Sequence, residues 1–175
     1  MSVLKPHFPN LTSLGDANPF VDRMRDILER IKLFEDFEGN DLETMARYMY
    51  CYLAPSGTEI IREGAPGDFM LLIIEGSVEI VKLDDNSMPT RIGMAGPGKM
   101  LGEMSLIDGE PRFASSVAVV DTLFAVLDRE NLSRIIANEP RIGVKIMTEL
   151  LMVLNQRLRN VSNELIKLLA ERKRG

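Results

Sequence analysis

Between Tyr48 and Leu127, short apolar or alternating runs are separated by Gly, Pro, Asn and Asp at intervals of about eight to twelve residues. Such spacing is typical of antiparallel sandwiches and barrels, because each strand ends where one of these residues can make a turn. The segment therefore predicts a jelly-roll-like β-roll. The expected strands are Tyr48–Leu53, Glu59–Arg62, Phe69–Ile74, Ser77–Leu83, Thr90–Met94, Ser115–Val119 and Thr122–Leu127.

Two helices are expected before the first of these strands. Residues 1–17 show no periodicity and are interpreted as a flexible leader. Asn18 followed by Pro19 resembles an N-cap with proline in the first turn, and apolar residues then recur at helical spacing. Asn40, with Glu43 three residues later, resembles a capping box and predicts a second, short helix. Residues 18–138 are therefore expected to form one domain.

A short helix capped by Asp128 and then a long helix are expected after the strands, the long helix running from Pro140 to about Lys173 within a segment 139–175. Apolar residues alternate along the long helix at spacings of four and three, a heptad seam. Its members are Met147, Leu151, Leu154, Leu158, Val161, Leu165 and Leu168. We expect a homodimer through Met147–Leu168, the alternative being a helix folded back on its own protomer. The fold class is thus mainly β with flanking helices, including a long C-terminal dimerisation helix.

The composition excludes most histidine and cysteine chemistry. His7 is the only histidine and Cys51 the only cysteine, so neither a histidine-based metal site nor an internal disulfide can form. We expect no metal, no enzymatic activity and a reducing, cytoplasmic location. No apolar run is long enough to span a membrane. With 21 Lys+Arg against 26 Asp+Glu, the net charge of −5 argues against broad nucleic-acid binding.

The segment from Gly102 to Ser115 interrupts the β region with a short apolar helical turn. A helical turn starting at Glu103 leaves backbone N–H groups free, and these favour an anion. Arg112 can pair bidentately with phosphate oxygens, and the Glu103 carboxylate can accept a hydrogen bond from a sugar hydroxyl. Ala114 leaves room for a ligand, while Ser115 offers a hydroxyl and an N–H. Together these residues predict a pocket for a sugar phosphate, unless Glu103 and Arg112 only form an ion pair that holds the loop.

This segment resembles the phosphate-binding cassette of the cyclic-nucleotide-binding domain family, which includes catabolite activator proteins, regulatory subunits of cyclic-AMP-dependent kinase and cyclic-nucleotide-gated channels. The family pattern is Gly-Glu, a few apolar residues, and then Pro-Arg-x-Ala-Ser/Thr. Gly102-Glu103, Pro111-Arg112 and Ala114-Ser115 match it. Glycines at the family's β-turns also match, namely Gly57, Gly64, Gly67 and Gly76. The resemblance covers about Ile31 to Glu164 and implies N-terminal helices, an eight-stranded β-roll and a following helix pair.

The resemblance also assigns roles by position. It implies that Arg112 and backbone N–H groups near Ala114 and Ser115 bind the cyclic phosphate, and that Glu103 binds the ribose 2′-hydroxyl. It further implies that the long helix covers the base, with Ser162 or Asn163 contacting adenine on its own or the neighbouring barrel. The expected ligand-binding residues are Gly102, Glu103, Met104, Ser105, Arg112, Phe113, Ala114, Ser115, Ser162 and Asn163.

Phe113 departs from the family pattern, in which this position commonly carries Ala, Ser or Thr. Relatives that prefer cyclic GMP often use a hydroxyl there, which phenylalanine lacks, so the ligand expected is cyclic AMP. The prediction is a sensor module that acts through movement of its C-terminal helices on an unidentified downstream protein. Alternatives are a nucleotide-free scaffold or dimerisation domain, or a piece of a Crp-like transcriptional regulator without its helix-turn-helix. Because only Leu165–Gly175 follow the matched region, direct DNA binding is not expected.

Overall fold

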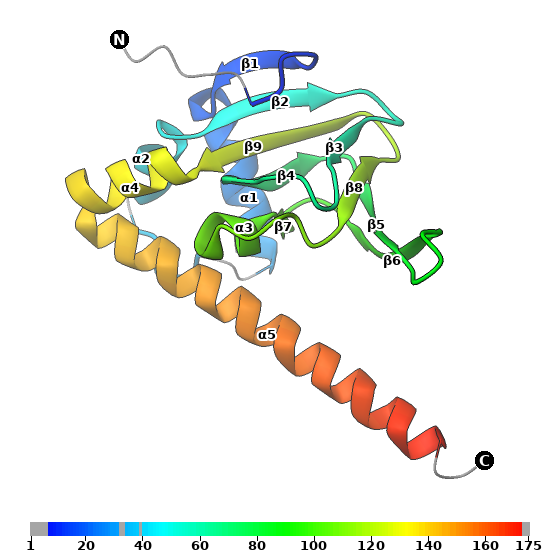
Figure 1. The fold of residues 1–175 in the computed structure, drawn as a ribbon. Helices are drawn as coiled ribbons and strands as arrows, with labels where there is room; N and C mark the ends of the chain where they lie inside the picture. The colour runs from blue at the N-terminus through cyan, green and yellow to red at the C-terminus, as the bar shows by residue number, and fades with distance from the viewer. Residues whose placement is uncertain (1–6, 32–33, 39, 173–175) are drawn as a thin grey trace.

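Two antiparallel sheets form the body of the protein in a computed structural model that describes residues 7–31, 34–38 and 40–172 (Figure 1). One sheet has the strand order β1-β2-β9-β4-β7 and the other the order β3-β8-β5-β6. The strands are β1 Thr12–Asp16, β2 Tyr50–Ala54, β3 Glu59–Ile61, β4 Phe69–Glu75, β5 Val78–Leu83, β6 Pro89–Ala95, β7 Met100–Leu101, β8 Ser115–Ala118 and β9 Thr122–Asp128. The expected β-roll with flanking helices is confirmed.

Helices lie before, within and after the strands. They are the 3-10 turn η1 Asn18–Phe20, α1 Val21–Ile31, α2 Asp41–Ala46, α3 Glu103–Asp108, α4 Arg129–Asn138 and α5 Pro140–Arg172. The predicted cap of α4 is confirmed, because the Asp128 carboxylate accepts from the Asn131 N–H at 2.6 Å. The short helix predicted after Asn40 is confirmed, with Asn40 at its N-cap position, but the predicted capping box is wrong because the Asn40 side chain makes no capping hydrogen bond. None of the helices among the described residues is long and apolar enough to cross a membrane.

The interpretation of residues 1–17 as a leader without regular structure is wrong for Thr12–Asp16, which form β1 and pair antiparallel with β2. All five residues are exposed and the ladder shifts register between Ser13 and Asp16, so the strand carries no alternating pattern. Before this strand, Phe8 packs against the hydrophobic core that lies between the two sheets. Residues 1–6 of the expected leader lie outside the described residues.

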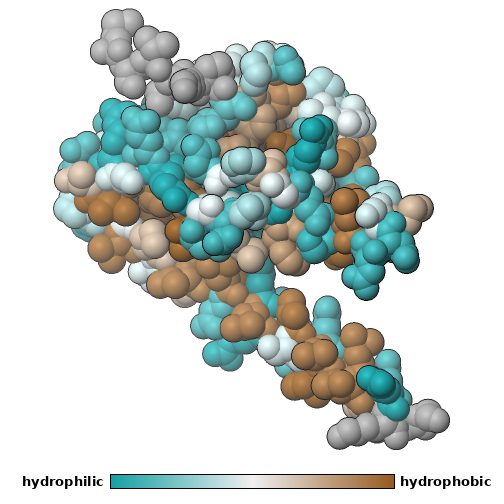
Figure 2. Space-filling view, viewed as in Figure 1, coloured by the Kyte–Doolittle hydropathy of each residue, from teal (hydrophilic) through white to brown (hydrophobic). Residues whose placement is uncertain are grey.

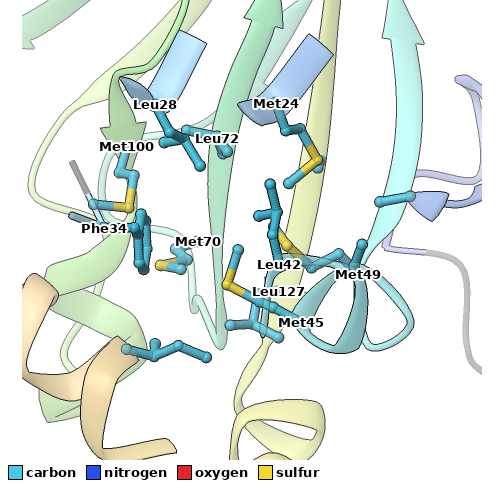
Figure 3. Packing of buried hydrophobic residues seen from close by; sticks show 14 of the residues in the cluster. Met24, Leu28, Phe34, Leu42, Met45, Met49, Met70, Leu72, Met100 and Leu127 are labelled. Atoms are coloured by element: carbon cyan, nitrogen blue, oxygen red, sulfur yellow. The ribbon is translucent and has the colours of Figure 1, made fainter. Parts of the chain in front are cut away.

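The strands β4 and β9 of the five-stranded sheet are buried on both faces. Met70 and Leu72 of β4 point to a core shared with the helices, whereas Leu71 and Ile73 point to a core shared with the other sheet. In Figure 3, methionine and leucine side chains from α1, α2, β4, β7 and β9 meet in the first of these cores. Packing on both faces explains why β4 has a nearly continuous apolar sequence. The strand is therefore a rigid support for Phe69 at its start.

Helix α5 begins on the barrel and then leaves it (Figure 1). Ile146 and Leu150 are buried in the first core, but Leu158, Val161 and Leu165 are 65%, 62% and 54% exposed. Figure 2 shows hydrophobic side chains along this outer part of the helix. In the described chain α5 does not fold back, so the outer part of the heptad seam, from Leu158 to Leu168, has no cover from its own protomer, whereas Met147 packs against the first core.

Candidate functional site

Helix α3 interrupts the sheet between two glycines in left-handed conformation, Gly102 at φ 82° and Gly109 at φ 77°. The helical turn predicted from Glu103 is thus confirmed. A Cβ on Gly102 would collide with the Arg112 guanidinium and the Phe69 carbonyl oxygen, so glycine suits this position both sterically and conformationally. The turn places Glu103 and Ser105, both buried, beside Arg112.

Arg112 is 4% exposed, and its guanidinium packs closely against neighbouring groups. Its Nη1 donates to the Gly102 carbonyl at 2.9 Å, and its Cζ lies 4.2 Å from the centre of the Phe69 ring. A Cβ on Gly67 would overlap the same guanidinium. Burial lowers the pKa of Arg112, while the nearby Asp68 and Glu103 carboxylates raise it. Nη2 is buried without a hydrogen-bond partner among the described residues, so it is available to an anion.

Glu103 is 1% exposed and pairs with Arg157, which lies outside the predicted set of ligand-binding residues. Its Oε1 accepts a hydrogen bond from Arg157 of α5, whose Nη2 also donates to the Met100 carbonyl at 2.5 Å. Oε2 of Glu103 is buried without a partner among the described residues. The salt bridge that involves Glu103 is therefore with Arg157, not the Glu103–Arg112 pair considered as an alternative.

The periodicity of α5 places Arg157 on the face of the helix that packs against the barrel. Ile146, Leu150 and Val153 form the barrel-facing stripe of α5 at spacings of four and three, and Arg157 continues it after four more residues. A basic residue in an apolar stripe indicates a buried or partly buried acceptor opposite. Only the fold identifies that acceptor as Glu103.

A cavity of about 90 Å³ lies between α3, the β8 end of the cassette and Arg157. Its lining includes eight of the ten residues expected at the ligand, namely Gly102, Glu103, Met104, Ser105, Arg112, Phe113, Ala114 and Ser115. Ser162 and Asn163 are exposed on α5 outside this lining. Ser162 is five residues past Arg157, about 140° around the helix, and so points away from its own barrel. A contact from Ser162 or Asn163 to a neighbouring barrel stays a prediction.

Two cassette residues have structural partners. The Ser115 hydroxyl accepts from the Glu63 N–H at 2.9 Å and donates to Glu59 Oε1 at 3.2 Å, so it is already hydrogen-bonded within the protein. Phe113 is 55% exposed at the cavity mouth, with Lys82 Nζ 4.4 Å from its ring centre. Lys82 also donates to the Phe113 carbonyl at 2.7 Å. The Lys82 contacts attach Phe113 to β5, and the Ser115 hydrogen bonds attach the end of the cassette to β3 and Glu63.

A larger groove of about 580 Å³ also borders Arg157 and lies between the middle of α5, residues 35–36 and the turn before β7. Glu149 lines it and is 7% exposed. Burial raises the pKa of Glu149, and the negative charges of Asp36 and Glu35 raise it further, against a hydrogen bond from the Phe34 N–H that lowers it. The ionised form of Glu149 therefore destabilises the fold at neutral pH.

Replacing Glu149→Gln is expected to stabilise the protein at pH 7, because the amide keeps an acceptor for the Phe34 N–H without a buried charge. Because the pKa of Glu149 is higher in the folded than in the unfolded state, its carboxylate costs no folding stability below the unfolded-state pKa. The loss of stability grows as pH rises above that value and is complete above the folded-state pKa. Thermal unfolding should therefore show a higher Tm for E149Q at pH 7 and a difference that shrinks toward pH 4. A lower Tm at pH 7 would contradict the assignment.

Among the residues that the structure describes, no three His, Cys, Asp or Glu side chains gather in a way that could hold a metal ion. The donors and acceptors around the cavity are instead a guanidinium, a carboxylate and backbone groups. These are ligands for a small organic anion with hydroxyl groups.

The chain is similar to a family model, to solved structures and to curated proteins. The model of the family described as "Cyclic nucleotide-binding domain" matches residues 54–139. A cyclic nucleotide-binding domain from Methylobacillus flagellatus KT is 39% identical, with a TM-score of 0.83 over 93% of this chain and 92% of that one. A CRP-like cAMP-activated global transcriptional regulator of Mycobacterium tuberculosis is 31% identical over 146 residues, 83% of this chain and 63% of the relative.

The regulatory domain of Toxoplasma gondii protein kinase A, solved with cAMP, is 25% identical, with a TM-score of 0.59 over 67% of this chain and 44% of that one. The similarity thus extends to a kinase regulator as well as to a transcriptional regulator. The chain spans about three fifths of the length of the curated relatives that it matches first, at 63%, 63% and 60%.

Proposed function

Since the chain belongs to the cyclic nucleotide-binding domain family, we propose that it is a regulatory module that binds a cyclic nucleotide, cAMP rather than cGMP, and responds by moving α5. Binding shifts the population of conformations and involves no chemical step. The free, buried thiol of Cys51 supports a reducing compartment, and we propose the cytoplasm.

One observation carries this proposal: two buried, unpartnered polar atoms line the same cavity. Arg112 Nη2 is a charged donor and Glu103 Oε2 is a charged acceptor, and neither has a hydrogen-bond partner among the described residues. A buried polar group without a partner costs about 1–3 kcal/mol, which a ligand can recover. A cyclic nucleotide supplies both partners, since its phosphate accepts from Arg112 and its ribose 2′-hydroxyl donates to Glu103.

The choice of cAMP rests on the cavity mouth. Phe113 lies there and has no hydroxyl with which to meet the amino and carbonyl groups of guanine. Its ring instead offers an apolar surface to a base. The names of two relatives, one activated by cAMP and one solved with cAMP, support the same choice.

Access to the site requires α5 to change position. The cavity of about 90 Å³ is well below the roughly 300 Å³ at the lower end of small-molecule sites. Arg157 narrows it by bridging Glu103 and the Met100 carbonyl. A ribose that approaches the free Oε2 of Glu103 must therefore compete with the Arg157 guanidinium for space in the cavity. Release of Arg157 links ligand binding to α5, because Arg157 is the charged contact of that helix with the cassette.

Replacing Arg157→Gln is expected to tighten cAMP binding roughly fivefold, since a partly exposed ion pair worth about 1 kcal/mol no longer has to be broken. The same variant should show faster amide hydrogen exchange in α5 before ligand is added, and a smaller change on addition. Calorimetry and hydrogen exchange measure the two effects. Arg159→Gln, two residues further along and exposed, is the matched control. Weaker binding by R157Q would contradict the competition.

The exposed seam of α5 supports a second proposal, a homodimer through Met147–Leu168. A single protomer leaves Leu158, Val161, Leu165 and Leu168 more than half exposed, and their heptad spacing fits another copy of the same helix. In such a dimer Ser162 lies beside the seam and would face the neighbouring barrel, whereas Asn163 lies on the opposite side of the helix. The downstream partner would read the position of α5.

The experiment that tests the function is isothermal titration of the full chain with cAMP and, separately, with cGMP. We expect saturable binding of cAMP and weaker binding of cGMP. Tighter binding of cGMP would overturn the role given to Phe113. Absence of binding to both would favour the nucleotide-free scaffold or dimerisation domain.

A further inference from the structure

The side chain of Phe69 contacts both Arg112, the proposed phosphate-binding residue, and the N-terminal segment. Phe69 begins β4 directly after Gly67-Asp68, and its ring centre lies 4.2 Å from Arg112 Cζ. The same ring is contacted by His7 at a centroid distance of 5.1 Å and by Phe8 at 5.2 Å, the latter in an edge-on geometry. Residues more than sixty positions apart thus meet on one aromatic ring.

Phe8 and His7 also contact residues other than Phe69. Phe8 packs edge-on against Tyr52 at 5.1 Å and Phe124 at 5.5 Å, two rings of the core between the sheets. His7 Nε2 lies 3.0 Å from Asp128 Oδ2. Asp128 is the residue opposite Phe69 in the β4–β9 ladder and also the cap of α4. The contacts of His7 and Phe8 therefore restrict the position of the Phe69 ring.

An aromatic ring is a suitable support for an anion-binding guanidinium. A carboxylate in hydrogen-bonding contact would neutralise Arg112 and would compete with a phosphate for its N–H groups. A ring attracts the cation through its electrons and leaves the N–H groups in the guanidinium plane unoccupied. This matches the structure, in which Arg112 donates only from Nη1, to Gly102, and Nη2 has no partner among the described residues.

We propose that Phe69 is a positioning residue for Arg112, and that His7 and Phe8 hold its ring in place, so that the N-terminal segment supports the nucleotide site from outside the cavity lining. This inference rests on the proposed function for its effect on affinity. The positioning itself can be measured without nucleotide, because the Nε–H of a fixed, buried arginine gives a distinct NMR signal that exchanges slowly with water.

The first test measures how fast the Arg112 Nε–H exchanges with water in the nucleotide-free wild type and in variants. The signal is assigned by its loss in Arg112→Ala. We expect slow exchange in the wild type and in Phe69→Tyr, which keeps the ring, and exchange at least tenfold faster in Phe69→Leu. Phe8→Leu should accelerate it to a lesser degree. Phe37→Leu is the matched control, since Phe37 also packs on an aromatic neighbour and near a lysine, but away from the cassette. Unchanged exchange in F69L would overturn the inference.

The second test measures cAMP affinity for the same variants. F69L should bind about tenfold more weakly, F69Y about as the wild type, and F37L unchanged. In an Arg112→Ala background, titrated at high nucleotide concentration, F69L should cause no further loss. An equal loss in that background would show that the ring acts on folding rather than through Arg112, and would overturn the inference. If the wild type binds no nucleotide, the proposed function fails, and the NMR comparison alone decides whether Phe69 positions Arg112.

Discussion

Arg112→Ala should weaken cAMP binding by about tenfold to a hundredfold, because charge-assisted hydrogen bonds contribute about 1.5–3 kcal/mol. The guanidinium is 4% exposed and its Nη2 has no other partner among the described residues, so water cannot readily replace it. Isothermal titration of the wild type and the variant measures the loss. Binding by R112A as tight as by the wild type would show that the cassette is not the nucleotide site.

Two controls separate the loss of ligand contacts from damage to the fold. Arg112→Lys keeps a positive charge but loses the planar pair of donors, so its affinity should fall between the wild type and R112A. Arg91→Ala, on exposed β6, removes an arginine without touching the cassette and should bind as the wild type does. Thermal unfolding of all variants is needed as well, since R112A also removes the hydrogen bond to the Gly102 carbonyl.

Leu158→Glu combined with Leu165→Glu should convert the proposed dimer into a monomer. Each leucine that is buried in an interface contributes roughly 1.5–3 kcal/mol to the free energy of association, and the double variant removes two from each protomer. The glutamates also place charges of the same sign opposite one another in the interface. Sedimentation velocity at micromolar concentration should show the mass falling by half. Both residues are exposed in the protomer, so the barrel itself should remain folded.

The matched control for the seam is Lys167→Glu. It introduces the same side chain into the same exposed part of α5, but on the side of the helix away from Leu158 and Leu165. This variant should remain dimeric. A monomeric wild type, or a double variant that remains dimeric, would overturn the proposal that Met147–Leu168 is the dimer seam.

Seven of the nine strands in the described part of the chain were predicted within two residues of their observed bounds, because strand alternation and turn residues are local signals. The two that were missed lack such signals. All five residues of β1 are exposed, and pairing with β2 and packing of the preceding residues hold it in place. β7 is only two residues long and exists because it pairs with β4.

The cassette was predictable for the same reason. Residues Gly102–Ser115 are contiguous, so the turn glycine, the carboxylate and the arginine are brought together by a short stretch of chain. The periodicity of α5 indicated an acceptor opposite Arg157 without identifying it, and no local pattern indicated a role for Phe69. Arg157 is 54 residues from Glu103, and Phe69 gains its role by meeting both Arg112 and the residues before β1. Such contacts depend on how α5 and the N-terminal segment pack on the barrel, and packing is a property of the whole chain.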